Sequence, residues 1–228
     1  MSKPPNSKKA KVMIVEDHPM FRERLAHLIN QGDDLEVCGE ADNIRDGFDM
    51  ILNRQTDVAI VDLTLKGSNG LELIKNLAAA GSAVPVLVLS MHDESLYAER
   101  ALRAGAKGYI SKHEASAQIM TALRHVLKGG IFLAPAAATK ILGNLAGKSA
   151  NTKNGMDRLT DRELEVFDLI GRGRSTREIS IKLTLGSATV ETYRARIKEK
   201  LGLQNAIQLQ QEATRWLHDT SKAVAALS

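Results

Sequence analysis

The sequence is poor in cysteine and in long apolar runs. Its one cysteine, Cys38, cannot form an intramolecular disulfide and excludes a metal cluster built from several thiolates. No apolar run reaches the roughly 20 residues that a membrane-spanning helix needs. Lysines occur near the start of the chain, but no apolar stretch follows them as in a secretory signal. We therefore expect a cytoplasmic protein that does not cross a membrane.

Apolar and charged residues are present in ordinary amounts, 43% and 25%, which are typical of a globular protein. The 228 residues fit two domains of about 100 to 150 residues or fewer. The net charge of +4 is unevenly spread: residues 11–128 hold 13 Lys and Arg against 17 Asp and Glu, whereas residues 157–228 hold 12 against 10. An acidic front and a mildly basic rear suit a sensor joined to a nucleic-acid-binding domain, but the difference is too small to decide the function.

Short aliphatic runs alternate with amphipathic stretches over residues 11–128, after a basic N-terminal arm at 1–10. Strands joined by helical crossovers form a parallel sheet with helices on both faces. We therefore expect an α/β domain with a five-stranded doubly wound parallel sheet. Its strands are expected at 11–15, 35–40, 58–61, 84–89 and 107–110, and its helices at 19–30, 44–53, 71–80, 94–104 and 115–127.

The alternation stops at Gly129, where glycine, proline, serine and asparagine become frequent. This composition predicts a linker over 129–156, with a short helix near 136–145. Beyond it the periodicity is helical only, and Thr160 with Glu163 forms a capping-box signature. We expect a small all-α domain over 157–215 with helices at 162–171, 176–183, 188–201 and 206–216. The C-terminal extension, 216–228, is expected to be an extra helical turn or a frayed end.

Polar residues follow four strands of the expected sheet, at the carboxyl ends where ligands of such sheets bind. Carboxylates that meet at one edge repel one another unless a divalent cation with oxygen ligands, most simply Mg²⁺, joins them. A lysine and a hydroxyl at the same edge suit a phosphoryl group, for which Asp62 is the natural nucleophile. The residues concerned are Glu16, Asp17, Asp62, Ser90 and Lys112.

The segments "VMIVEDH", "VAIVDLTL", "VLVLSMHDE" and "AKGYISK" resemble the receiver domain of two-component response regulators, over about residues 10 to 128. The resemblance implies that Asp62 accepts phosphate from a sensor histidine kinase, and that Glu16 and Asp17 hold Mg²⁺ together with Asp62. It also implies that Ser90 is the switch hydroxyl, that Lys112 contacts the phosphoryl group, and that Tyr109 is an aromatic residue that turns inward when Ser90 moves.

Simpler interpretations exist for several of these residues. A lone Asp62 at a strand end would be a turn residue, and Tyr109 would be a packing residue. His18, His92, His113 and His125 show no metal-ligand spacing, so we expect them at the surface or in packing. His92 and Thr64 each lie two residues after a pocket residue, where their side chains would screen the phosphoryl group from water and set its lifetime.

The stretch from Leu159 to Leu203 predicts two short helices around a tight turn, the second of them basic. This pattern is a helix-turn-helix whose second helix enters the major groove. It resembles the LuxR/NarL-type DNA-binding domain, and a receiver followed by such a domain is the NarL/FixJ-type architecture. The resemblance implies a regulator that dimerises on double-stranded DNA when phosphorylated. The candidate DNA contacts are Thr189, Glu191, Thr192, Arg194, Arg196, Lys198 and Lys200.

Three positions depart from that family's pattern. Gly186 stands where a serine commonly caps the second helix, so capping is weaker unless Ser187 replaces it. Glu191 stands where a lysine is usual, and Tyr193 where a histidine is usual. A carboxylate facing DNA repels phosphates, although it can accept a hydrogen bond from cytosine. Either the base preference is unusual or Glu191 points elsewhere.

Two other classes of function remain open. A Mg²⁺-dependent aspartyl phosphatase or phosphotransferase would carry a second aspartate two residues after the nucleophile, where this chain has Thr64. We therefore expect no enzyme. The second alternative is a receiver-controlled module that binds protein, with weak or no DNA binding. Glu191 suggests this alternative, because a carboxylate at that position would repel DNA phosphates.

Overall fold

The computed structural model describes residues 8–65, 67–91, 94–145 and 155–225. The chain divides into two compact units, Met1–Ala137 and Ala138–Ser228, here called the N-terminal and C-terminal units. The expected linker, 129–156, lies across this division, and its exact limits stay a prediction. No helix in the described part of the chain is both long and apolar enough to cross a membrane.

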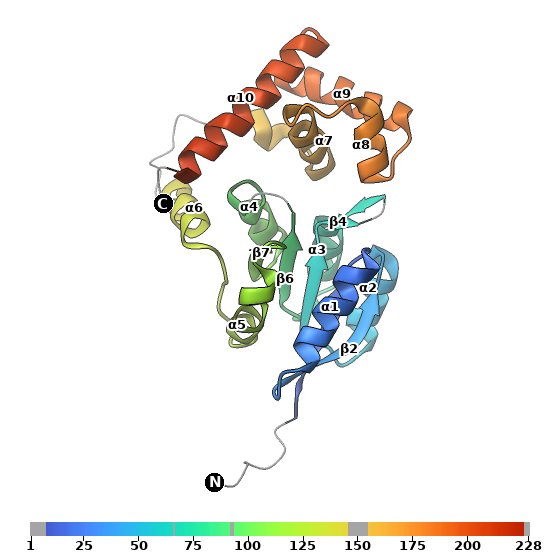
Figure 1. The fold of residues 1–228 in the computed structure, drawn as a ribbon, viewed down its shortest axis with the longest axis vertical. Coiled ribbons are helices and arrows are strands. Elements are labelled where there is room, and N and C mark those ends of the chain that lie inside the picture. Colours follow the sequence, from blue (N-terminus) through green and yellow to red (C-terminus); the bar gives the residue numbers. More distant parts are fainter. Residues whose placement is uncertain (1–7, 66, 92–93, 146–154, 226–228) are drawn as a thin grey trace. The chain divides into compact units, whose positions relative to one another are not determined.

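The N-terminal unit is built on a five-stranded parallel sheet with the order β2-β1-β3-β6-β7 (Figure 1). This order confirms the expected doubly wound fold, because it reverses direction after β1 and so leaves a crevice at the carboxyl ends of the neighbouring strands. Every residue of the central strands β3 and β6 is buried. The strands are β1 (Ala10–Val15), β2 (Leu35–Ala41), β3 (Val58–Asp62), β6 (Val86–Ser90) and β7 (Gly108–Ser111).

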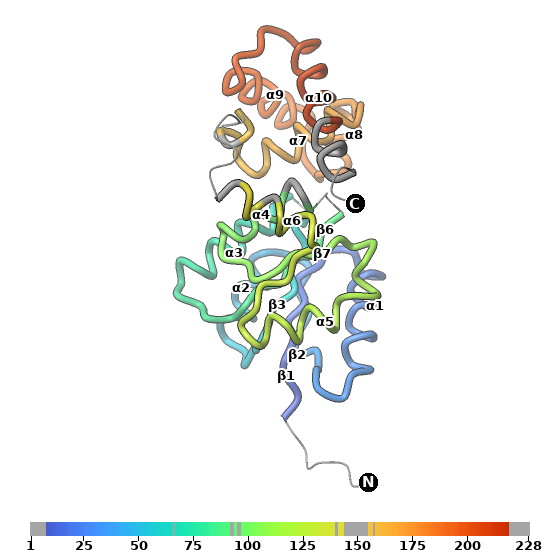
Figure 2. The backbone as a smooth tube through the Cα atoms, turned by 90° about the vertical axis from the view of Figure 1, so that its left-hand side faces the viewer, coloured from blue at the N-terminus to red at the C-terminus, as the bar shows by residue number. Residues whose placement is uncertain are grey.

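Helices cover both faces of this sheet (Figure 2). On one face α1 and α5 pack on alternate strand residues such as Val12, Ile14 and Ile60, whose side chains point the same way because strand residues alternate. On the other face α2 contacts α3, and α3 contacts α4. The bounds are α1 (Pro19–Asn30), α2 (Ile44–Asn53), α3 (Gly70–Ala79), α4 (Glu94–Ala104) and α5 (Ala115–Leu127).

A small hairpin between β3 and α3 was not expected from the sequence. Its strands, β4 (Thr64–Leu65) and β5 (Ser68–Asn69), pair antiparallel. Gly67 adopts φ +70° in the turn, a conformation that glycine takes without steric cost. Asn69 then caps α3 by accepting a hydrogen bond from the N–H of Leu71. The hairpin therefore fixes the path of the chain directly after Asp62.

The C-terminal unit is helical, as expected. The capping box of Thr160 and Glu163 is confirmed at the start of α7, and Ser175 with Glu178 forms a second one at the start of α8. A 3-10 turn, η1 (Gly155–Arg158), spans the end of the expected linker and the start of the expected helical domain. The helices are α6 (Pro135–Leu145), which begins in the N-terminal unit, α7 (Asp161–Gly171), α8 (Thr176–Leu183), α9 (Ser187–Leu201) and α10 (Ala206–Ala225).

The last helix is longer than the sequence pattern indicated. α10 continues from Ala206 through Trp216 to Ala225 without a break. The ring of Trp216 lies 5.5 Å from the ring of Phe167 on α7, centroid to centroid. Such tilted aromatic contacts stabilise helix packing. The start of the expected extension is therefore part of the helical core of this unit.

Candidate functional site

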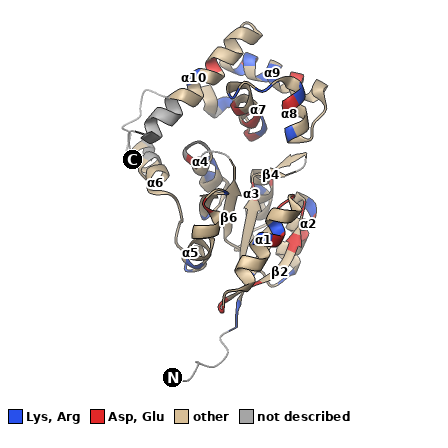
Figure 3. Ribbon diagram, in the orientation of Figure 1, with Lys and Arg blue, Asp and Glu red and all other residues tan. Residues whose placement is uncertain are grey.

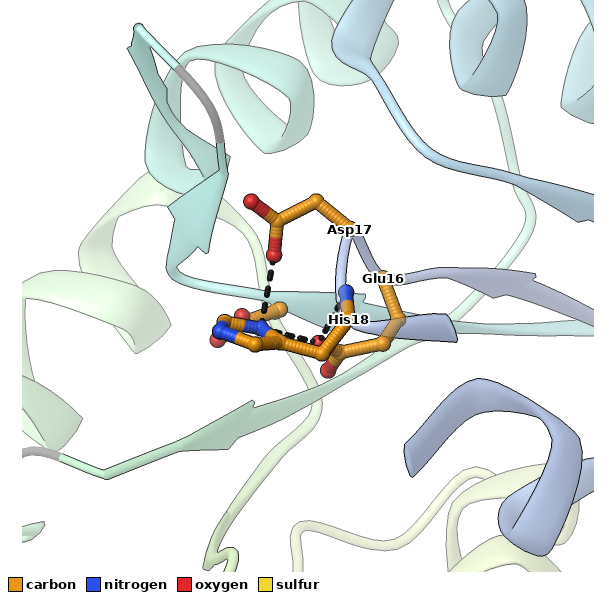
Figure 4. A group of neighbouring side chains, drawn as sticks. Glu16, Asp17 and His18 are labelled. Atoms are coloured by element: carbon orange, nitrogen blue, oxygen red, sulfur yellow. Dashed lines mark hydrogen bonds and ion pairs between the residues drawn. The ribbon is translucent and has the colours of Figure 1, made fainter. Parts of the chain in front are cut away.

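Three carboxylates meet at the carboxyl edge of the N-terminal sheet. Glu16 and Asp17 directly follow β1, and Asp62 is the last residue of β3. They are only 1%, 8% and 2% exposed. One ligand atom from each of them, together with one from His18, lies within 4.8 Å of all the others. Figure 4 shows Glu16 and Asp17 extending toward the His18 ring. The sheet topology thus gathers residues that are 46 positions apart in sequence.

Lys112 supplies the positive charge at this edge. Its Nζ donates to Asp62 Oδ2 at 2.8 Å and lies 2.6 Å from Glu16 Oε2. The ammonium also lies 4.8 Å from the centroid of the Phe21 ring, a cation–π contact. Because the Lys112 side chain is only 7% exposed, these contacts hold the ammonium against the two carboxylates.

The environment of Asp62 raises its pKa to about 7. Burial is the largest cause, since it disfavours the charged carboxylate, and the negative charge of Glu16 adds to it. Lys112 and the N–H of Thr64, which donates to Asp62 Oδ1 at 3.2 Å, act in the opposite direction. Burial lowers the pKa of Lys112, but the charges of Asp62 and Glu16 outweigh it and raise that pKa. Lys112 thus offsets only part of the effect that burial and Glu16 have on the pKa of Asp62.

The donor set fits a divalent cation with oxygen ligands. Three carboxylates are buried here, and burying charged carboxylates is costly unless a cation approaches them. Carboxylate oxygens are the ligands that Mg²⁺ prefers. Glu16, Asp17 and Asp62 are the residues that would hold it.

Ser90 and Tyr109 lie on the same face of the sheet. In the parallel pairing of β6 with β7, Val88 is opposite Tyr109 and Ser90 is two residues further along β6. Residues two apart on a strand point the same way, so the Ser90 and Tyr109 side chains share one face. Both are fully buried. The sheet therefore places both side chains on one buried face, on neighbouring strands.

Sequence reasoning missed two residues next to Asp62. Gly70 starts α3, and a Cβ added there would lie 2.0 Å from the carbonyl oxygen of Asp62. Asn69, which caps this helix, is 1% exposed. The signal in the sequence was the Asn-Gly pair shortly after Asp62, where only glycine permits so close an approach. The side-chain role expected for Thr64 stays a prediction, and His92 lies outside the described residues.

His18 was expected to be a surface or packing histidine, and its side chain is indeed 68% exposed. Its Nδ1 nevertheless lies 2.9 Å from Glu16 Oε1 and 2.8 Å from Asp17 Oδ1. The ring belongs to the rim of the acidic pocket. The available signal was its place directly after two strand-end carboxylates.

In the C-terminal unit, α9 exposes a face that carries several of the candidate DNA contacts. Lysine and arginine positions recur along this helix (Figure 3). Thr189, Thr192 and Arg196 are exposed, whereas Val190 and Ile197 are buried on the opposite side. Lys198 is partly exposed. Lys200 differs from these residues in having a partner within the unit: its Nζ donates to Glu163 Oε2 of the α7 capping box at 2.6 Å.

The Glu191 carboxylate accepts a hydrogen bond from within the C-terminal unit. The hydroxyl of Thr176 on α8 donates to Glu191 Oε1 at 2.6 Å. Arg194 Nε lies 3.8 Å from the same oxygen, and the Arg194 side chain is 17% exposed. Gly186 caps α9 without any side-chain hydrogen bond, as expected from the sequence. Of the two possibilities for Glu191, the contacts favour a carboxylate directed at α8.

Comparisons with known proteins identify one family in each unit of the chain. Residues 12–124 match the family described as "Response regulator receiver domain", and residues 157–213 match "Bacterial regulatory proteins, luxR family". The transcriptional regulatory protein DesR of Bacillus subtilis is 34% identical over 197 residues, which are 86% of this chain and 92% of DesR. The oxygen regulatory protein NreC of Staphylococcus carnosus is 32% identical over 210 residues, 90% of this chain and 97% of NreC. The chain belongs to the NarL/FixJ family of response regulators.

This response regulator is a transcription regulator in which a receiver domain is joined to a LuxR-type DNA-binding domain. Solved structures share its fold. A LuxR-family two-component response regulator from Aurantimonas is 29% identical, with a TM-score of 0.56 over 61% of this chain and 99% of that one. RcsB from Salmonella enterica serovar Typhimurium, solved with the promoter P1flhDC and the phosphomimetic BeF3−, is 25% identical, with a TM-score of 0.55 over 90% and 97% of the two chains.

Proposed function

We propose that Asp62 is the phosphoryl acceptor of this regulator and that a sensor histidine kinase is the donor. The observation that carries the proposal is the buried Asp62 carboxylate between the Lys112 ammonium at 2.8 Å and the N–H of Thr64 at 3.2 Å. An ammonium group and an N–H donor that both contact one buried carboxylate suit a site where negative charge increases during the reaction.

In the proposed step, an oxygen of Asp62 attacks the phosphorus of a phosphohistidine. A new Asp62 O–P bond forms, the P–N bond of the donor breaks, and the leaving imidazole takes up a proton from solvent. Lys112 then contacts the phosphoryl oxygens, which carry the charge. A Mg²⁺ ion held by Glu16, Asp17 and Asp62 supplies charge neutralisation and alignment when bound.

The proposed signal passes from Ser90 to Tyr109. Ser90 hydrogen-bonds the new phosphoryl group, and the Tyr109 side chain, on the same face of the sheet, adjusts to the vacated space. Such a switch is a population shift between two arrangements of the domain, biased by the added charge. The full burial of Tyr109 supports an inward position of the ring as one of these two arrangements.

The proposed output is a homodimer that binds double-stranded DNA through α9. The RcsB relative was solved with a promoter and a phosphomimetic, which supports the same role here. The hydrogen bond from Thr176 to Glu191 also supports DNA binding, because a carboxylate directed at α8 repels DNA phosphates less. This weakens the alternative of a module that binds only protein. We retain as DNA contacts Thr189, Thr192, Arg194, Arg196, Lys198 and Lys200, whereas Glu191 lies beside them with its carboxylate directed at α8.

Phosphorylation by acetyl phosphate tests the acceptor assignment. With Mg²⁺, the wild type should gain the mass of one phosphoryl group, and Asp62→Asn should gain none. Asp33→Asn, which changes an exposed carboxylate of the same unit, is the matched control and should be phosphorylated like the wild type. Removal of Mg²⁺ with a chelator should stop the reaction. Phosphate on Asp62→Asn would assign the acceptor to another residue.

A further inference from the structure

The chain that follows α5 pairs with the edge of the five-stranded sheet. β7 is the last strand in the sheet order, and Gly108 on it forms a parallel bridge with Phe132. The N–H of Phe132 donates to Lys107 O at 3.0 Å, and the N–H of Tyr109 donates to Phe132 O at 2.9 Å. These two hydrogen bonds are those of a parallel strand pair. β7, α5 and residues 130–134, here called the edge segment, thus repeat the strand–helix–strand unit of the sheet.

The ring of Phe132 also holds the edge segment against the domain. It packs against the core cluster that α5 shares with the sheet, and it meets the ring of His125 on α5 edge to face, at 6.1 Å between centroids. The neighbouring side chain, Ile131, is 54% exposed. The edge segment is therefore held by its backbone bonds and by the Phe132 ring.

A third hydrogen bond ties the edge segment to α4. The N–H of Ala134 donates at 2.6 Å to Oε1 of Glu94, the first residue of α4. This helix begins four residues after Ser90, at the end of β6, and β7 carries Tyr109. The edge segment is therefore bonded to the elements that follow one residue of the proposed switch and carry the other. α6 begins directly after it, at Pro135.

We propose that the edge segment passes the state of the Ser90–Tyr109 switch to α6, with Phe132 as the positioning residue that keeps it on β7. This inference rests on the proposed function, since it names the path by which the switch reaches the chain beyond the receiver. Packed interiors have low compressibility and transmit strain. A displacement of β7 therefore moves Phe132 and, three residues later, the start of α6.

The path requires the edge segment to stay paired in both states of the receiver. Detachment would remove the partners of the Tyr109 N–H and of Lys107 O, and leaving backbone polar groups unpaired is costly. It would also remove the Phe132 ring from the core cluster. Movement of β7 together with the edge segment avoids both costs.

Substitution of Phe132 separates phosphorylation from DNA binding. Phe132→Ala should accept phosphate from acetyl phosphate and Mg²⁺ like the wild type, because its contacts lie on β7 and α5. The gain in DNA affinity on phosphorylation, measured by gel shift, should fall about 2- to 30-fold. Phe132→Leu keeps an apolar side chain and should restore most of the gain. Ile131→Ala removes the exposed neighbouring side chain and is the matched control, which should keep the wild-type gain.

The ratio of the two DNA affinities distinguishes this role from a purely structural one. A structural role would lower the stability measured in urea and leave the ratio unchanged. A wild-type ratio in folded, phosphorylated Phe132→Ala would overturn the proposal, as would an equal loss in Ile131→Ala. A wild type that gains no affinity on phosphorylation would instead refute the proposed function, and the path with it.

Amide hydrogen exchange in the wild type tests the pairing without any substitution. The N–H groups of Phe132 and Tyr109 should exchange slowly with and without acetyl phosphate and Mg²⁺, since both donate hydrogen bonds at the sheet edge. Exchange of the Phe132 amide at the rate of an open chain in either state would contradict a segment that stays paired. This measurement decides the question even if Phe132→Ala does not fold.

Discussion

Replacing Gly70 by alanine should impair phosphorylation more than stability. The added Cβ would lie 2.0 Å from the carbonyl oxygen of Asp62, whereas real Cβ contacts are not shorter than 3.0 Å. The two backbones must therefore separate by at least 1.0 Å, the difference between these distances. No flexible side chain can absorb this shift, and the N–H of Gly70 is itself bonded to Leu63 O at 2.7 Å.

The displaced atom belongs to the proposed acceptor residue. A misplacement of about 1 Å at a reacting group costs on the order of 100-fold in rate, whereas crowding of this kind costs about 1 to 3 kcal/mol of stability. We therefore expect Gly70→Ala to remain folded but to be phosphorylated roughly 100-fold more slowly. The assay is the initial rate with acetyl phosphate and Mg²⁺, measured beside urea unfolding.

Gly108→Ala is the matched control, since it crowds the same sheet at its other end. Its Cβ would meet Leu87 Cδ1 at 2.8 Å and Phe132 O at 2.9 Å. We expect a similar loss of stability with the rate of phosphorylation retained. A wild-type rate in folded Gly70→Ala would refute the reasoning, and so would an equal loss of rate in Gly108→Ala.

Three further outcomes are expected. Glu191→Lys should raise non-specific DNA affinity and steepen the salt dependence of binding by about one unit; an unchanged slope in a salt titration would place Glu191 off the interface. Glu163→Gln should lower the unfolding free energy at pH 7 by about 1 kcal/mol, and urea titrations should show this difference vanishing on acidification. Phosphorylation should strengthen self-association, and a monomer by sedimentation in both states would contradict the dimer.

The direction of the pH effect at Glu163 follows from its surroundings. Burial raises its pKa, but the hydrogen bonds from Lys200 and Thr160 outweigh burial and hold the pKa below its usual value. A carboxyl with a lowered pKa in the folded state stabilises the fold when charged. That contribution is present above the unfolded pKa of about 4.3 and is lost as the pH falls through the folded pKa. Below that range the wild type and Glu163→Gln should be equally stable.

The parallel sheet and most helix ends were predictable because local signals mark them. Pro19 at the start of α1 and the Thr160 capping box of α7 fix helix starts through contacts within a few residues. The proximity of Asp17 and Asp62 could also be predicted, since parallel strands bring their carboxyl ends to one edge of the sheet whatever their separation in sequence. The roles expected for the site residues stay predictions.

Other features depend on packing that the sequence does not display. The β4–β5 hairpin has strands of only two residues, too short for an alternating pattern. The hydrogen bond from Thr176 to Glu191 depends on how α8 and α9 pack against each other. The approach of α3 to Asp62 depends on tertiary packing, which Gly70 permits but does not specify. The place of His18 next to the pocket was visible in the sequence, but the direction of its ring toward Glu16 and Asp17 was not.

Control of DNA binding by phosphate on Asp62 is the central claim, and one comparison tests it directly. The affinity for DNA selected by the phosphorylated protein should be measured by gel shift for the wild type and Asp62→Asn, each with and without acetyl phosphate and Mg²⁺. Coupling of about 1 to 3 kcal/mol predicts a 5- to 150-fold gain in wild-type affinity and none in Asp62→Asn. An unchanged affinity in phosphorylated wild type, or an equal gain in Asp62→Asn, would contradict the account.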